Sequence, residues 1–384
     1  MHAITTTDDL ARICSAARNE PYVTLDTEFI RERTYYSRLC LIQMALPGDH
    51  GEAVLIDPLC DGLSLEPLYE LFRHEKTVKV FHAARQDLEI FFVDANVFPV
   101  PLFDTQVAAM VCGFGDQVGY ETLVRKIARQ SLDKTSRFTD WSRRPLSEAQ
   151  KSYALADVTH LRIIYEFLAG ELKRTGRQKW VEEELGVLLD PETYINRPEE
   201  AWMRIKTRTT SGRFLAIVRE LARFRETYAQ TRDVPRNRVF KDDALLELAS
   251  SKPQSVEDLG RSRLLLREGR RADVAEGILA AIRAGLESSP EDFPRPDTRR
   301  EQLQVNPALA DLLRVLLKAK SEDAGVAQKL IATSGDLDAL AAGDRKVQAL
   351  KGWRGEVFGA DALRLCKGEI ALSARGGAVR VVPV

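Results

Sequence analysis

The sequence predicts an α/β domain with a mixed β-sheet, followed by two small domains made of helices alone. Up to about residue 200, short strand-like runs come first in succession and then alternate with helical segments, which is typical of a mixed sheet with helices on its faces. Beyond residue 200 the alternation disappears, and helical spacing dominates to about residue 365. We therefore expect domains over residues 1–200, 208–288 and 297–384.

The first domain opens with a helix expected over residues 5–18, followed by a strand over residues 22–29 that alternates apolar and polar side chains. Residues 38–45 form a near-continuous apolar run, which is typical of a strand in the centre of a sheet. A strand over residues 53–57 ends at Pro58, a helix follows over residues 65–73, and a further strand covers residues 76–81.

The composition is that of a soluble globular protein, with 44% hydrophobic and 29% charged residues among 384. A formal net charge of −1 gives no global attraction to nucleic acid or membranes, so such attraction must come from local patches. No apolar run reaches the roughly 18 residues of a membrane span, and the first residues lack the pattern of a secretory signal. Five scattered cysteines argue against a disulfide framework or a structural zinc site. We expect a cytoplasmic monomer.

Asp26 and Glu28 carry the first functional signal. They are two residues apart on the predicted strand and therefore project from the same face. Adjacent carboxylates repel each other unless one is protonated or a cation lies between them. Oxygen ligands of this kind suit Mg²⁺ or Mn²⁺. The alternative is the solvated face of an edge strand, and this stretch alone does not decide between the two.

Polar residues also follow the later strands. Asp87 lies in the first turn of the helix that begins after residue 82, where its charge would complement the helix dipole. Asp104 precedes the next helix and suits its N-cap, so we assign it a structural role. His82, at the end of a strand, is likewise typical of a hydrogen-bonded structural residue.

Another acidic position lies on a helix that begins at Ser147, which can form a capping box with Gln150. We expect this helix to run to about Gly170. Tyr153 and Asp157 are four residues apart and share one face of it. Apolar neighbours indicate that Asp157 is buried, which is costly without a metal or a cationic partner. The alternative is a hydrogen bond between the two side chains at the surface.

The loop over residues 132–146 mixes cationic with aromatic side chains. Such a mixture suits a nucleic-acid backbone with stacked bases. The alternative is a loop that packs Trp141 on the core and leaves its charges in water, and the two interpretations are compatible with each other. The candidate substrate contacts are Lys134, Arg137, Trp141 and Arg143.

Together these motifs resemble a known family. The order Asp26-x-Glu28, then Asp87, then Tyr153-x-x-x-Asp157 is similar to the three exonuclease motifs of the DEDD superfamily, and the tyrosine marks its DEDDy branch. The residues around the motifs, at 25–29, 82–87, 103–105 and 139–146, look like those of the ribonuclease D family. The resemblance covers roughly residues 1–200, and every acidic position is filled.

The resemblance implies a ribonuclease H-like fold and a metal-dependent 3′-5′ exoribonuclease that releases nucleoside 5′-monophosphates, with tRNA precursors as expected substrates. It implies two divalent metal ions, Mg²⁺ or Mn²⁺, bound by Asp26, Glu28, Asp87 and Asp157. Such ions, ~4 Å apart, can stabilise both the attacking and the leaving oxygen at phosphorus. Tyr153 would orient the attacking water, because a phenol with an ordinary pKa of about 10 is a poor base at neutral pH.

The second half of the chain adds candidates for nucleic-acid binding. Residues 203–241 hold eleven Arg or Lys against three acids, which indicates a basic patch or, as the usual alternative, a solvated helix face. Residues 234–245 are similar to the helicase-and-ribonuclease-D C-terminal (HRDC) domain, with a match over roughly 208–288. A Pro-rich linker at 288–296 separates it from residues 297–384, which look like a second, diverged HRDC domain that ends in a strand or hairpin over 370–384.

Two other functions are weighed against this one. A DNA exonuclease tied to replication or unwinding is disfavoured, because the chain contains no polymerase or helicase motif. A catalytically silent RNA-binding adaptor would have lost an acidic position, and none is lost.

Overall fold

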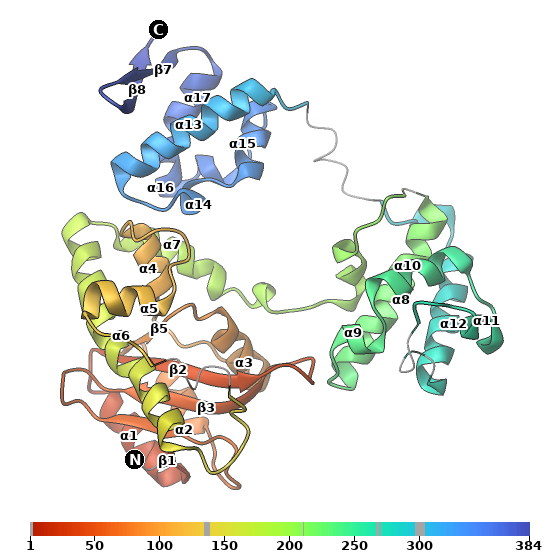
Figure 1. The fold of residues 1–384 in the computed structure, drawn as a ribbon, viewed down its shortest axis with the longest axis horizontal. Helices are drawn as coiled ribbons and strands as arrows, with labels where there is room; N and C mark the ends of the chain where they lie inside the picture. Colours follow the sequence, from red (N-terminus) through yellow and green to blue (C-terminus); the bar gives the residue numbers. More distant parts are fainter. Residues whose placement is uncertain (1–2, 134–138, 210, 266–268, 270, 296–303) are drawn as a thin grey trace. The chain divides into compact units, whose positions relative to one another are not determined.

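The structure is a computed structural model that describes residues 3–133, 139–209, 211–265, 269, 271–295 and 304–384. Its contacts divide the chain into two compact units, and most of their helices and strands are labelled in Figure 1. Unit 1 comprises Met1–Glu28, Cys40–Asp190 and Gln302–Val384, and unit 2 comprises Phe29–Leu39 and Pro191–Glu301. The domain boundaries expected from the sequence stay predictions.

A six-stranded sheet in the order β1-β4-β3-β2-β5-β6 forms the centre of unit 1. It is mixed, as predicted, because β4 runs antiparallel to β3 but parallel to β1, and β5 is parallel to both β2 and β6. Apolar patterns in short segments produce these strands. Their bounds are β1 (Ala3–Ile4), β2 (Tyr22–Ile30), β3 (Arg38–Ala45), β4 (Ala53–Ile56), β5 (Val78–Phe81) and β6 (Leu102–Asp104).

Helices flank this sheet in Figure 1. Helix α1 packs on α2, and α6 packs on β4 and β5. They are α1 (Thr7–Ala17), α2 (Glu66–Phe72), α3 (Arg85–Ala95), α4 (Thr105–Val111), α5 (Tyr120–Leu123), the π-helical turn η1 (Val124–Ala128), α6 (Glu148–Thr175) and α7 (Gln178–Leu188). The capping box of Ser147 and Gln150 at the start of α6 is confirmed. The helix continues past Gly170, because a mid-helix glycine costs only about 1 kcal/mol, and it ends at Gly176, whose φ of 69° is left-handed.

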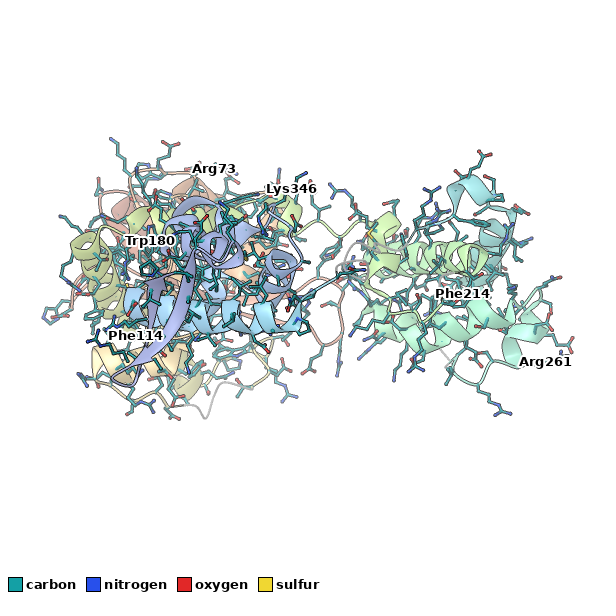
Figure 2. The ribbon with its side chains drawn as sticks, turned by 90° about the horizontal axis from the view of Figure 1, so that it is seen from above. Arg73, Phe114, Trp180, Phe214, Arg261 and Lys346 are labelled. Carbon is teal, nitrogen blue, oxygen red and sulfur yellow. The ribbon has the colours of Figure 1, made fainter. Side chains whose placement is uncertain are left out.

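The C-terminal residues pack on the sheet domain within unit 1. The Trp353 ring stacks on Trp180, which is labelled in Figure 2, with 4.6 Å between ring centroids. Arg354 forms an ion pair with Glu184, and both side chains are 11% exposed. The elements are α13 (Pro307–Ala324), α14 (Gln328–Ile331), α15 (Ser334–Ala341), η6 (Gln348–Leu350), α16 (Gly352–Arg354), η7 (Gly355–Gly359), α17 (Ala360–Cys366) and the hairpin of β7 (Ile370–Arg375) and β8 (Ala378–Pro383).

Unit 2 is helical, as predicted for the chain beyond residue 200. Its core is built on α8, which packs against α12, α10 and η3. None of the helices within the described ranges of either unit is long and apolar enough to cross a membrane. The elements are η2 (Pro191–Thr193), η3 (Pro198–Arg204), α8 (Gly212–Thr231), α9 (Arg236–Val239), α10 (Asp242–Ser251), α11 (Val256–Gly260), α12 (Ala272–Glu287) and η5 (Pro290–Asp292).

Candidate active site

Three carboxylates from distant parts of the sequence converge in unit 1. Asp26 and Glu28 lie on β2, and Asp157 lies on α6. One oxygen from each lies within 4.8 Å of the others, and Asp157 is only 8% exposed. Burial, followed by the negative charges of neighbouring carboxylates, Asp157 first among them, raises the pKa of Asp26 well above its usual range. Hard oxygen donors with an excess of negative charge fit a divalent cation.

Asp87 joins this cluster from the first turn of α3. Its charge adds to those that raise the pKa of Asp26. Asp87 is 5% exposed, and it accepts a hydrogen bond from the Thr27 hydroxyl on β2. Burial raises the pKa of Asp87 to about 7, although the Thr27 hydrogen bond opposes the shift. The four acidic residues of the sequence motifs therefore lie at one place, and their catalytic roles stay predictions.

Strand register explains why these motifs meet. Thr24 of β2 pairs with Val80 of β5, and Phe81 of β5 pairs with Asp104 of β6, so the carboxyl ends of three parallel strands share one edge of the sheet. The Asp104 carboxylate accepts from the backbone N–H group of Gln106 at 2.7 Å, as an N-cap does. It also accepts from the N–H groups of residues 83 and 84, and so it fixes the turn that begins α3.

Tyr120 and Thr24 fix the position of α6 beside the cluster. The Tyr120 hydroxyl donates to the backbone oxygen of Asp157 at 2.7 Å and accepts from the N–H of Leu161, so it bridges two backbone groups that a helix ordinarily joins directly. The Thr24 hydroxyl donates to the backbone oxygen of Val158 at 2.8 Å. Tyr120 was not among the predicted site residues, because it lies in no sequence motif and contacts α6 only through tertiary packing.

A pocket of about 250 Å³ opens beside the carboxylates. Tyr153 lines it, and the buried Trp141 ring lies 6.1 Å from the Tyr153 ring. Arg144 holds the backbone of Trp141 in place through a hydrogen bond of 2.8 Å and also binds Asp57 at the end of β4. The full lining consists of Asp26, His82, Gly119, Tyr120, Glu121, Thr122, Leu132, Tyr153, Asp157 and Leu161.

The four predicted substrate contacts differ in where the structure places them. Trp141 is 2% exposed, so its ring is not available to stack on a base, and the prediction of a direct contact is corrected. The alternative, in which Trp141 packs on the core, is the one that the structure supports. Arg143 has a side chain that is 84% exposed and pairs with Asp140 at 3.2 Å. Lys134 and Arg137 lie outside the described residues.

Comparison with known proteins agrees with this site. The family profile described as a 3′-5′ exonuclease matches residues 1–173, and the HRDC domain profile matches residues 214–282. A ribonuclease D of Jannaschia sp. (strain CCS1) is 64% identical over 384 residues and covers both chains completely. A ribonuclease D of Nitrobacter hamburgensis is 47% identical over 99% of this chain and 98% of its own.

A solved structure extends the agreement to the fold. The crystal structure of Escherichia coli RNase D superimposes with a TM-score of 0.83 at 30% identity, over 96% of this chain and 99% of the other. Fold and site together define a metal-dependent 3′-5′ exonuclease joined to an HRDC domain. Within that class, the chain belongs to the ribonuclease D family. The predicted identification and the predicted exoribonuclease activity are thereby confirmed.

Proposed function

We propose that this chain trims the 3′ ends of RNA, with tRNA precursors as its substrates, and that it works in the cytoplasm as a monomer. The convergence of Asp26, Glu28 and Asp157 within 4.8 Å carries the proposal, because such a cluster suits phosphodiester hydrolysis assisted by bound cations. The ribonuclease D relatives support RNA rather than DNA as the substrate.

The four acidic residues hold two divalent cations, Mg²⁺ or Mn²⁺, in this proposal. Bound there, such cations activate water and neutralise charge on the attacking and leaving oxygens. Burial and then the charges of Asp157, Asp87 and Glu28 raise the pKa of Asp26, and a bound cation would offset that repulsion. Asp87, held by the Thr27 hydroxyl, completes the set.

Tyr153 orients the reacting water in the pocket. Its hydroxyl is a hydrogen-bond partner rather than a base, since phenols ordinarily titrate near a pKa of about 10. Water adds to phosphorus, the bond from phosphorus to the 3′ oxygen of the preceding nucleotide breaks, and that oxygen takes a proton. A nucleoside 5′-monophosphate leaves, and the RNA is one residue shorter.

The test compares 3′-extended tRNA, unstructured RNA and DNA of matched length, each with Mg²⁺, Mn²⁺ or EDTA. We expect mononucleotides from RNA only when a metal is present. Asp157→Asn should lose this activity, while Asp61→Asn, which changes an exposed acid outside the pocket, should keep it. Faster trimming of DNA would move the proposal to DNA metabolism, and RNA binding without any hydrolysis would favour the adaptor.

A further inference from the structure

One surface of unit 1 beside the pocket combines exposed cations with one exposed and one half-buried aromatic ring. We call it the α6–η1 surface and define it by Phe114, Arg125, Lys126, Arg129, Ile163 and Phe167. We propose that it binds the single-stranded RNA segment that precedes the nucleotide being removed. The proposal rests on the proposed function, and it adds the path that the substrate follows outside the pocket.

The cations lie on and just after η1. Arg125, Lys126 and Arg129 are exposed, and within the described residues none of them forms an ion pair. A run of cations is usually only a solvated face. Here it stands on a π-helical turn, a local distortion that is frequent at functional sites. Phosphate groups of a nucleic-acid strand are the complementary partner for three such charges.

The aromatic rings lie beside these cations. Phe167 on α6 is 43% exposed, and its ring centroid is 6.0 Å from that of Phe114, at an interplanar angle of 83°. The Lys126 ammonium lies 6.0 Å from the centroid of the Phe114 ring, which is labelled in Figure 2. Because η1 packs on α6, its cations lie on an element that contacts the helix carrying Phe167. Proteins that bind single strands combine a cationic groove with aromatic faces in this way.

Two features connect this surface with the pocket. Tyr153, His160 and Phe167 repeat every seven residues along α6 and so share one stripe of the helix. Glu121 and Thr122 line the pocket immediately before η1 in the chain. Along α6, the distance from Tyr153 to Phe167 is about 21 Å at a rise of about 1.5 Å per residue. A stacked strand spans it with about six nucleotides at ~3.4 Å each.

The binding test is done in EDTA, so that it does not depend on hydrolysis. The probe is a fluorescent single-stranded RNA of twelve nucleotides, and the variant is Arg125→Gln/Lys126→Gln/Arg129→Gln. We expect the Kd to rise at least about tenfold, and the slope of log K against log salt to fall in magnitude by about 2, at roughly 0.7 for each phosphate that is no longer neutralised. The control, Lys173→Gln/Lys179→Gln/Lys318→Gln, removes three exposed cations elsewhere in unit 1 and should change neither value.

The aromatic part is tested by Phe167→Ala. Loss of one stacked base should weaken binding of the same RNA by roughly fivefold to a hundredfold. Val187→Ala, at an apolar residue of α7 that is 61% exposed, is the matched control. Equal affinity of the variants and their controls would overturn the proposal and leave the surface for an acidic protein partner or for solvent.

Hydrolysis of a dinucleotide with Mg²⁺ gives the last readout, because two nucleotides do not extend from the pocket to Phe167. We expect both variants to cleave it like the wild type, with the loss in kcat/KM confined to the longer RNA. An equal loss on both lengths would place the effect in the pocket and contradict the proposal. A wild type that hydrolyses neither RNA, yet binds the longer one through this surface, would reject the nuclease and support the inference.

Discussion

The acidic pocket of unit 1 and the helical core of unit 2 both contain buried carboxylates. The two regions differ in whether the protein itself supplies a cationic partner. In unit 2, Glu226 is 1% exposed, accepts from the Tyr35 hydroxyl, and has Arg236 at 3.0 Å. In the pocket, the charges that act most strongly on Asp26 come from other carboxylates. A carboxylate paired within the protein serves the fold, whereas a cluster of like charges stores repulsion that a bound cation removes.

The largest effect is expected from Asp26→Asn. Replacing a cation ligand should lower kcat/KM on RNA by roughly a thousandfold, which corresponds to about 4 kcal/mol of transition-state stabilisation. The same change should leave the metal-free protein at least as stable as the wild type, because it removes repulsion. Release of mononucleotides and thermal unfolding in EDTA measure the two effects. Loss of stability together with activity would show that Asp26 serves the fold.

Glu226→Gln should have the opposite effect to Asp26→Asn, with stability lost and catalytic activity kept. It leaves Arg236 without its charged partner, and we expect a loss of about 2–3 kcal/mol in the local stability of unit 2, at the lower end for a broken buried pair because Arg236 is partly exposed. Hydrogen exchange in α8 measures that loss, and cleavage of a dinucleotide should be unchanged. Glu257→Gln, at an exposed pair on α11, is the control. Unchanged exchange in α8 would mean that the pair does not stabilise the core.

Local patterns in the sequence predicted the regular parts of the fold and the acidic part of the site. A near-continuous apolar run predicted β3 over residues 38–45, and spacing placed Tyr153 and Asp157 on one face of α6. Asp104 was predicted as an N-cap, a role that depends only on the residues that follow it. These features could be predicted because each one is determined within a few residues of chain.

The features that escaped prediction depend on packing between distant segments. Tyr120 reaches the backbone of Asp157, 37 residues later in the chain, and no local pattern encodes that contact. Trp141 looked like a stacking residue because an aromatic side chain among cations has the same local pattern whether it is buried or exposed. The Asp104 carboxylate also accepts hydrogen bonds from the N–H groups of residues 83 and 84. That contact depends on the pairing of β5 with β6, which local sequence does not encode.

The pH dependence of stability tests the stored repulsion directly. The pKa of Asp87 is raised to about 7, and that of Asp26 is also raised, so the folded protein retains protons that the unfolded chain releases above a pH of about 4. The free energy of unfolding of the metal-free protein should therefore fall as the pH rises from about 4, where the unfolded carboxyls ionise, to about 7, where Asp87 ionises in the folded protein. We expect the melting temperature in EDTA to drop by about 5 °C between about pH 5 and pH 7, at roughly 2–4 °C per kcal/mol.

Saturating Mg²⁺ should flatten this dependence, because the cation binds the ionised carboxylates. Asp26→Asn/Asp87→Asn should flatten it without metal, and Glu226→Gln should leave it as in the wild type. If the melting temperature changed with pH equally in the wild type and the double variant, the repulsion would not come from Asp26 and Asp87.

The smallest effect concerns Arg144, which supports the pocket from a distance. Its guanidinium donates to both oxygens of Asp57, at 2.6 Å for one of them, to the backbone oxygens of Cys40 at 2.7 Å and Trp141 at 2.8 Å, and to its neighbour in the chain. Lysine offers three donors at one point rather than five in a plane. Arg144→Lys should therefore loosen Trp141, and with it the Tyr153 ring that lies against it.

We expect Arg144→Lys to lower kcat about tenfold with little change in KM, within the range for residues that orient a site from outside it. A double-mutant cycle with Tyr153→Phe separates positioning from a general loss of structure. If Arg144 acts through the tyrosine, its replacement costs little once the Tyr153 hydroxyl is gone. If the two losses in kcat add, Arg144 acts by another route, and the pocket depends on this loop for more than the orientation of one side chain.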